Sequence, residues 1–99
     1  MKYVVIFKAQ VKELDAEYFQ TAQYLREKAL DQFNCKKFES IAENGFEIAL
    51  SYWDSLEDIR AWHKNAEHQI AQGIGKEKWY ESFSVEICEV LKYYNYQTK

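Results

Sequence analysis

Proline is absent from this 99-residue chain, and glycine occurs only three times. Linkers and low-complexity segments are commonly rich in these two residues, so their scarcity argues against long unstructured stretches. A chain of this length also has room for only one modest hydrophobic core. We therefore expect a single domain over residues 1–99.

Basic clusters and long apolar runs are also lacking. The net charge is −3, and the one adjacent basic pair is Lys36–Lys37, which argues against a nucleic-acid binder. No apolar run approaches the ~20 residues of a membrane span, and the first residues lack the small-residue cleavage site of a signal peptide. We expect a cytoplasmic protein that binds neither nucleic acid nor membrane.

Cysteine is scarce and shows no metal-binding spacing. Cys35 and Cys88 fall far apart, both in predicted strands, without a CxxC or Cys/His pattern. We expect two free thiols and no metal site.

Aromatic residues, in contrast, make up 17% of the chain, with eight Tyr, six Phe and three Trp. One interpretation is a core and an interface built from large rings. The other is a ring-lined pocket for a planar ligand. The composition leaves both open.

The pattern along the chain predicts alternating strands and helices. Residues 3–11 are β-branched and aromatic and form a strand whose two faces are both apolar over its first half. Residues 14–33 show a helical apolar stripe, and Asp15 is the expected N-cap.

A β-hairpin is the clearest local prediction. Asn44-Gly45 lies between strands 35–43 and 46–53 and supplies the two positive-φ positions of a type I′ turn. This turn pairs Glu43 with Phe46 and places Ile41, Ile48 and Leu50 on one face. The other face carries Phe38, Ser40, Ala49, Ser51 and Trp53, and the sequence does not decide which face meets the helices.

The second half repeats the helix–strand order. Ser55 begins a helix with an S-x-x-[DE] capping pattern, residues 67–72 form a further helical piece, and Gly73-Ile74-Gly75 ends it. Residues 79–91 form the last strand, with Tyr80 and Phe83 on opposite sides if the strand is regular. The tail at 92–99 holds three more tyrosines, and we expect it to dock on a partner protomer.

The resulting order is β-α-β-β-α-β, an α+β ferredoxin-like arrangement with an antiparallel sheet. Two helices cover only one face of such a sheet, and the other face also carries apolar side chains. We therefore expect a homodimer in which a second copy covers that face.

A longer motif adds a family resemblance. It consists of Tyr52-Trp53, Ser55, Trp62, Glu67-His68, Gly75 and Trp79-Tyr80. The chain resembles the antibiotic biosynthesis monooxygenase family through this string and through its topology. The resemblance implies a dimeric α+β barrel with a pocket between sheet and helices in each protomer. It also implies one of several activities, since some relatives oxidise aromatic polyketides without metal or flavin, others oxidise quinols, and others degrade haem.

The haem-degrading pattern fits poorly. It requires an Asn on the first strand, where this chain has Phe7, and a Trp on the second helix, which Trp62 matches. The expected haem ligand position falls near Gln72, and His68 comes about one turn earlier. We therefore expect no cofactor, and haem binding through His68 is a disfavoured alternative.

The resemblance and the residue types together nominate a site. His68 is the candidate proton acceptor because imidazole titrates near neutral pH. The candidate substrate-binding residues are Trp62, Tyr52, Tyr80 and Phe7. The structural alternatives are a helix-end role for His68 and a packing role for Trp62.

The first functional hypothesis is a cofactor-independent monooxygenase that acts on a small phenol, quinol or polyketide-like aromatic. The second is a non-enzymatic dimeric protein that binds a planar ligand.

Overall fold

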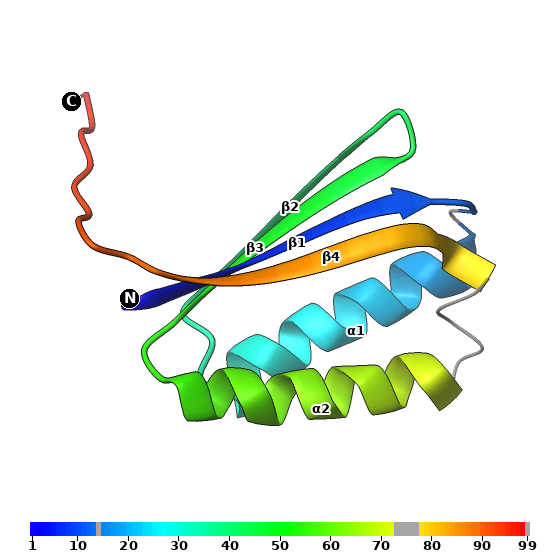
Figure 1. Ribbon diagram of the computed structural model, residues 1–99, viewed down its shortest axis with the longest axis horizontal. Helices are drawn as coiled ribbons and strands as arrows, with labels where there is room; N and C mark the ends of the chain where they lie inside the picture. Colours follow the sequence, from blue (N-terminus) through cyan, green and yellow to red (C-terminus); the bar gives the residue numbers. More distant parts are fainter. Residues whose placement is uncertain (14, 73–77, 99) are drawn as a thin grey trace.

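The computed structural model describes residues 1–13, 15–72 and 78–98, with the side chains of residues 67–72 outside the description. The chain folds as an α+β domain in the expected order, with both helices on one side of a four-stranded sheet (Figure 1). The elements are β1 (Tyr3–Val11), α1 (Ala16–Gln32), β2 (Lys37–Glu43), β3 (Phe46–Trp53), α2 (Leu56–Gln72) and β4 (Tyr80–Glu89). The helical piece expected at 67–72 is a continuation of α2, while the predicted stop at Gly73–Gly75 lies outside the described residues.

Both helices begin at the predicted caps. A side-chain oxygen of Asp15 accepts a hydrogen bond from the backbone N–H of Tyr18 at 2.7 Å. The Ser55 hydroxyl accepts from the backbone N–H groups of Glu57 and Asp58 at 3.1 and 3.3 Å. These bonds satisfy amide donors that the first turn of a helix otherwise leaves without partners.

The sheet is antiparallel throughout, with strand order β2-β3-β1-β4. The hairpin has the predicted register, from Glu43 opposite Phe46 to Lys37 opposite Tyr52. Asn44 and Gly45 have φ of 53° and 77°, as a type I′ turn requires. The carbonyl of Gly45 also accepts a hydrogen bond from the N–H of Val11 at 2.7 Å, which anchors the turn to β1.

The register decides which face the helices cover. Val5 pairs with Ser51 and Phe7 pairs with Ala49, and these residues lie on the same side as Phe38 and Trp53. This side packs against the helices. The opposite side carries Val4, Ile6, Ile41, Ile48, Leu50 and Tyr52, and no described helix covers it; we call it the open face.

The sequence analysis placed Tyr80 on the wrong face of the last strand. The ladder between β1 and β4 shifts so that Gln10 pairs with Ser82 while Val11 pairs with Tyr80, which leaves Glu81 as an extra residue. Such a bulge turns a side chain to the other face of a strand. Tyr80 therefore lies on the helix-facing side with Phe83 and not opposite to it.

A cluster of buried residues lies at one end of the helix–sheet interface. The core there comprises Val5, Ala29, Cys35, Trp53 and Ile59, with exposed fractions of 5% or less. These residues come from β1, the end of α1, the segment between α1 and β2, the end of β3 and the start of α2. The Trp53 indole N–H donates to the Ser51 hydroxyl at 2.8 Å, so its one polar atom is satisfied inside this core.

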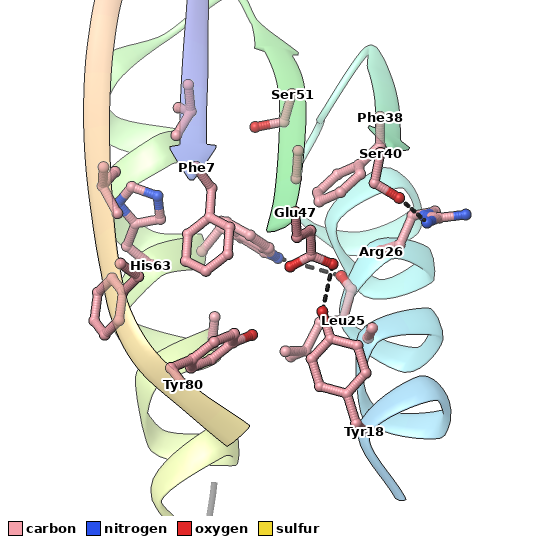
Figure 2. A pocket seen from close by; sticks show the side chains of 17 residues that line it. Phe7, Tyr18, Leu25, Arg26, Phe38, Ser40, Glu47, Ser51, His63 and Tyr80 are labelled. Atoms are coloured by element: carbon pink, nitrogen blue, oxygen red, sulfur yellow. Dashed lines mark hydrogen bonds between the residues drawn. The ribbon is translucent and has the colours of Figure 1, made fainter. Parts of the chain in front are cut away.

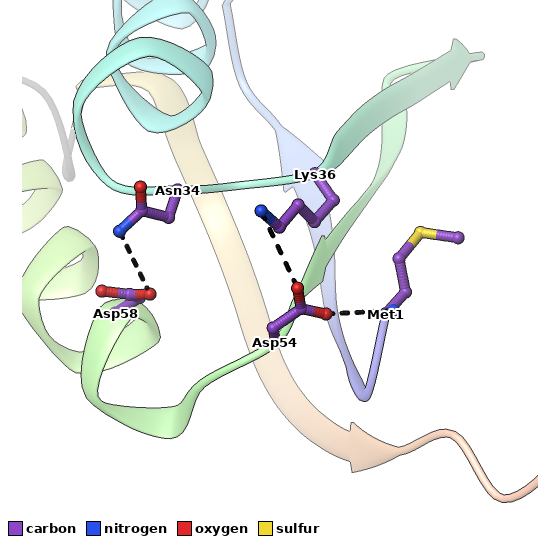
Figure 3. A network of polar contacts seen from close by, with 5 residues as sticks. All are labelled: Met1, Asn34, Lys36, Asp54 and Asp58. Carbon is purple, nitrogen blue, oxygen red and sulfur yellow. Dashed lines mark hydrogen bonds and ion pairs between the residues drawn. The ribbon is translucent and has the colours of Figure 1, made fainter.

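Polar contacts close the same end of the molecule (Figure 3). The carboxylate of Asp54 lies 3.0 Å from the amino group of Met1 and 3.8 Å from the Lys36 ammonium. The hydrogen bond and charge of the Met1 amine hold the pKa of Asp54 below its usual value. Nearby, the Asn34 amide donates to Asp58 at 3.4 Å and joins the end of α1 to the start of α2.

The chain after β4 runs away from the domain as an arm (Figure 1). Leu91, Tyr94 and Tyr96 are 89%, 80% and 85% exposed. Docking of this tail on a second protomer stays a prediction. No helix among the described residues is long and apolar enough to cross a membrane.

Candidate ligand pocket

A cavity of about 270 Å³ lies between the sheet and the two helices, next to the core cluster, with which it shares Val5. Figure 2 shows the 17 side chains that line it. Its floor and walls include several small residues, namely Ala22, Ser40, Ala49, Ser51 and Ala66. Because protein interiors are normally close-packed, small side chains facing one another across two layers leave space that a ligand can fill.

Four aromatic rings line one side of this cavity. Phe7 lies 5.6 Å from Tyr80 and 5.7 Å from Phe83, measured between ring centroids. Tyr18 from α1 lies 6.2 Å from Tyr80 across the helix–sheet interface. The β4 bulge is what brings Tyr80 into this group, so an irregularity of the edge strand completes the aromatic wall.

Trp62 serves both roles that the sequence left open. Its ring lies 5.7 Å from Trp53 and 5.9 Å from Phe38, and its indole N–H donates to the carbonyl of Leu25 at 3.3 Å. It therefore anchors α2 to the sheet and to α1. The same ring also lines the cavity, at the boundary with the core.

A carboxylate projects into this largely apolar space. Glu47 lies on β3, between Ala9 of β1 and Ala42 of β2, on the side that faces the helices. It accepts a short hydrogen bond from the hydroxyl of Tyr18, and the Tyr80 hydroxyl is directed toward the same region (Figure 2). Within the described chain, Glu47 forms no ion pair with a lysine or an arginine.

Burial and the Glu47 charge keep both tyrosines protonated. They raise the pKa of Tyr18 far above its ordinary value, with burial as the larger cause. The same two causes, again with burial first, raise the pKa of Tyr80 to about 12. The pocket thus holds one carboxylate acceptor beside two hydroxyl donors.

The residues nominated from sequence divide into three groups. Phe7, Trp62 and Tyr80 line the cavity. Tyr52 pairs with Val4 on the open face, so it is not part of this pocket. The side chain of His68 lies outside the described residues, whereas His63, five residues earlier on α2, lines the cavity.

Three polar groups of the pocket were missed from sequence: Glu47, Tyr18 and Arg26. A signal for Glu47 existed, because the hairpin register places it on the face of Ser40, Ala49 and Ser51. A single acid on a face otherwise made of small and apolar residues is an exception that sequence reasoning can detect. Tyr18 and Arg26 gave no such signal, since each fits an ordinary amphipathic helix.

Haem does not fit this cavity as it stands. A cavity of about 150 Å³ accommodates benzene, so 270 Å³ suits one or two fused rings and not a porphyrin of four pyrroles. Phe7 also occupies part of the space.

Known proteins share the sequence and the fold. The chain is 39% identical over 89 residues to the uncharacterized protein YqjZ of Bacillus subtilis, covering 89% of this chain and 78% of that protein. No model of a known protein family matches the chain.

The solved structures match at low sequence identity and therefore show the fold alone. A protein of unknown function from Nitrosomonas europaea has a TM-score of 0.72 at 11% identity and covers 98% of this chain and 96% of its own. A proposed antibiotic biosynthesis monooxygenase from Chloroflexus aurantiacus has a TM-score of 0.63 at 12% identity, covering 96% and 98%. A variant of MhuD with two manganese protoporphyrin IX molecules per active site has a TM-score of 0.57 at 14% identity, covering 93% and 98%. The expected ferredoxin-like α+β fold with an antiparallel sheet is thereby confirmed, while the dimeric barrel stays a prediction.

Proposed function

This chain belongs to the family of the Bacillus subtilis protein YqjZ and has the antibiotic biosynthesis monooxygenase fold, and from this premise we propose that it oxidises a small aromatic hydroxy compound with dioxygen. The substrate class is a phenol, a quinol or a short polyketide-like aromatic. The proposed reaction uses no metal, flavin or haem.

The observation that carries this proposal is the position of Glu47. A carboxylate at the wall of an aromatic pocket can accept the proton of a phenolic O–H. Tyr18 binds one of its oxygens, which orients the group and leaves the other oxygen for a substrate. Among the described side chains, this is the acceptor we select in place of the His68 imidazole that the sequence nominated.

The electrons and protons balance without an added reductant. A quinol that gives two electrons and two protons to dioxygen yields a quinone and hydrogen peroxide. An activated ring CH₂ of an anthrone-like substrate, oxidised to a carbonyl, takes one oxygen atom and releases the other as water. In both cases proton removal makes the substrate an electron-rich anion, which is the form that donates an electron to dioxygen.

The surroundings favour this chemistry. The rings of Phe7, Phe83 and Trp62 line the cavity and can contact the faces of a planar substrate. The hydroxyl of Tyr80, which stays protonated at neutral pH, can donate to the developing oxyanion. The proton acceptor and a donor therefore lie on the same side of the cavity.

Oxygen uptake tests the proposal. We expect turnover of a hydroquinone, a 1,4-naphthalenediol or an anthrone above the uncatalysed rate, in protein without added metal, flavin or haem. Glu47→Gln keeps an acceptor for Tyr18 but is a far weaker base, so we expect a loss of at least about a hundredfold in kcat. Glu27→Gln, the same change on the exposed surface of α1, is the control and should retain full activity.

Two results would contradict the proposal. One is binding of these compounds without any oxygen uptake, which indicates the non-enzymatic ligand-binding protein instead. The other is a shifted Soret band on addition of haem together with haem-dependent uptake, which indicates a haem protein.

We also propose that the working form is a homodimer in which two open faces pack together. A compact monomer of 11.9 kDa is expected to expose about 6,000 Å², whereas this chain exposes 7,181 Å². The larger surface reflects a shape less compact than that of a typical monomer, with an extended tail and a sheet face that no described helix covers. Ile41, which is 73% exposed on the open face, is the kind of side chain that such an interface buries.

A further inference from the structure

Arg26 is a second charged residue of the cavity lining besides Glu47, and it lies on the side where α1 meets β2. Its terminal nitrogen donates to the hydroxyl of Ser40 at 2.8 Å, and its guanidinium carbon lies 5.7 Å from the centre of the Phe38 ring. Arg26, Ser40 and Phe38 all line the same cavity. Figure 2 shows the contact with Ser40, on the far side of Phe38 from Phe7 and Tyr80.

The hydrogen-bonding capacity of this guanidinium is largely unused. Its Nε atom is buried and has no hydrogen-bond partner, and within the described chain no carboxylate pairs with the group. An arginine presents five N–H donors in a planar fork. A buried N–H donor of a positively charged group, left without an acceptor beside an apolar cavity, is unfavourable until an acceptor satisfies it. A planar anion, above all a carboxylate, is the acceptor that matches the fork.

Arg26 and Glu47 lie far enough apart to hold opposite ends of one ligand. Tyr18, which binds Glu47, and Arg26 are eight residues apart on α1, or about 12 Å along its axis. Ser40, which binds Arg26, lies two residues along β2 from the position opposite Glu47, or about 7 Å. The two charges are therefore separated by about the length of one or two substituted rings, and they do not pair with each other.

We propose that the natural ligand is a hydroxylated aromatic acid of one or two rings, with its carboxylate bound by Arg26 and its hydroxyl directed at Glu47. The orientation rests on the proposed function, because it uses Glu47 as the acceptor of the substrate proton. The carboxylate contact itself does not, since a protein that only binds the ligand would need it equally. The volume of about 270 Å³ accommodates two fused rings.

Binding of a matched pair of probes tests the proposal. The probes are 6-hydroxy-2-naphthoate and its neutral amide, titrated calorimetrically without oxygen. We expect the wild-type protein to bind the acid tighter than the amide by roughly tenfold to a hundredfold, the range for hydrogen bonds to a charged group. Arg26→Met should abolish that preference while amide binding stays at the wild-type level, which also shows that the variant is folded. Arg26→Lys should retain part of the preference, because it keeps the charge and loses the fork.

The control is Arg60→Met, the same substitution at an exposed position of α2 outside the cavity lining, and it should leave both affinities unchanged. Equal binding of acid and amide by the wild-type protein would overturn the proposal without need of any variant. A preference for the acid that survives Arg26→Met would overturn it as well.

The outcomes also separate this inference from the proposed function. An acid preference that depends on Arg26, in a protein that consumes no oxygen, upholds the ligand class and refutes the oxidation. Turnover of neutral quinols with no acid preference upholds the oxidation and refutes the role of Arg26.

Discussion

At the scale of single residues, the pocket is defined by a few polar groups placed where apolar ones would pack more easily. Leucine in place of Glu47 would fill part of the cavity and remove a charge from the helix–sheet interface. The protein instead places the Tyr18 hydroxyl against this carboxylate, with Tyr18 itself only 3% exposed. A buried hydrogen bond to a charged group is costly to break on one side, since the partner is left unsatisfied.

We predict that Tyr18 and Glu47 are energetically coupled. Tyr18→Phe should lower the free energy of unfolding by about 1–3 kcal/mol in the wild-type protein, because it leaves the carboxylate without its donor. The same substitution should cost much less in a Glu47→Leu background, where no acceptor remains. Urea denaturation of the four proteins measures the coupling. Tyr94→Phe on the exposed tail should have no effect, and additive costs for the two pocket substitutions would contradict the prediction.

The contact between Tyr18 and Glu47 also shows which features of the site could be predicted from the sequence and which could not. The face of Glu47 follows from the Asn44-Gly45 turn, so its place beside the small residues Ser40, Ala49 and Ser51 could be predicted. That this face meets the helices could not be predicted from the sequence. Nor could the partner of Glu47 be predicted, because Tyr18 is 29 residues away and belongs to a helix whose rotation against the sheet depends on the whole core. Phe7 and Trp62 were nominated through the family resemblance. Trp62 matches the Trp that the haem-degrading pattern has on the second helix, and Phe7 stands where that pattern has an Asn on the first strand.

At the scale of helices and strands, local side-chain chemistry sets where the helices begin and how the hairpin pairs. The bulge in β4, in contrast, depends on pairing with a strand far away in the sequence. Asp15, Ser55 and the Asn44-Gly45 turn each act within a few residues, so their positions predict where helices start and how the hairpin is registered. The bulge at Glu81 has no comparable local signal, since neither glycine nor proline marks it. It is a feature of the pairing of β4 with β1, and without it Tyr80 would point to the open face.

The N-cap of α1 offers a test at this scale. Asp15 accepts from the Tyr18 N–H and lies 3.0 Å from the Lys78 ammonium, and these contacts hold its pKa below the ordinary value, the backbone hydrogen bond being the larger cause. Asp15→Ala should lower the melting temperature by a few degrees. Asp15→Asn should cost less, because it keeps the capping oxygen and loses the ion pair.

The pH dependence of this difference has a defined sign. A carboxylate with a depressed pKa in the folded state stabilises the protein above its unfolded pKa of 3.8, and the stabilisation disappears as the pH falls through the folded value. The destabilisation by Asp15→Ala, measured by thermal unfolding, should therefore be full near pH 7 and shrink below pH 4. A difference that stays constant across this range would refute the charged cap.

At the scale of the whole molecule, two apolar or aromatic surfaces of the single chain are not covered by the rest of the domain. The open face carries Ile41, Ile48 and Leu50, and the tail carries exposed tyrosines that contact little of the domain. Edge strand β4 ends beside the start of β1, where the Val90 N–H donates to the Lys2 carbonyl at 2.8 Å, and the arm begins at the same place. An arm that leaves the sheet at this position can reach a second sheet packed on the open face.

Dimerisation by this face is therefore expected and can be measured. Light scattering at micromolar concentration should give twice the chain mass of 11.9 kDa, and the melting temperature should rise with protein concentration, as it does when association stabilises the fold.

Ile48→Glu places a carboxylate in the centre of the open face, opposite Ile41 on β2 and beside Lys8 on β1. In a dimer this charge is buried without a partner from the other copy, whereas in a monomer it is solvated and lies near the Lys8 ammonium. We expect a monomer that still folds, with a melting temperature independent of concentration. Leu30→Glu, on the exposed surface of α1, is the matched control and should remain dimeric. A wild-type mass of one chain, or an Ile48→Glu variant that remains a dimer, would show that the open face is not the interface.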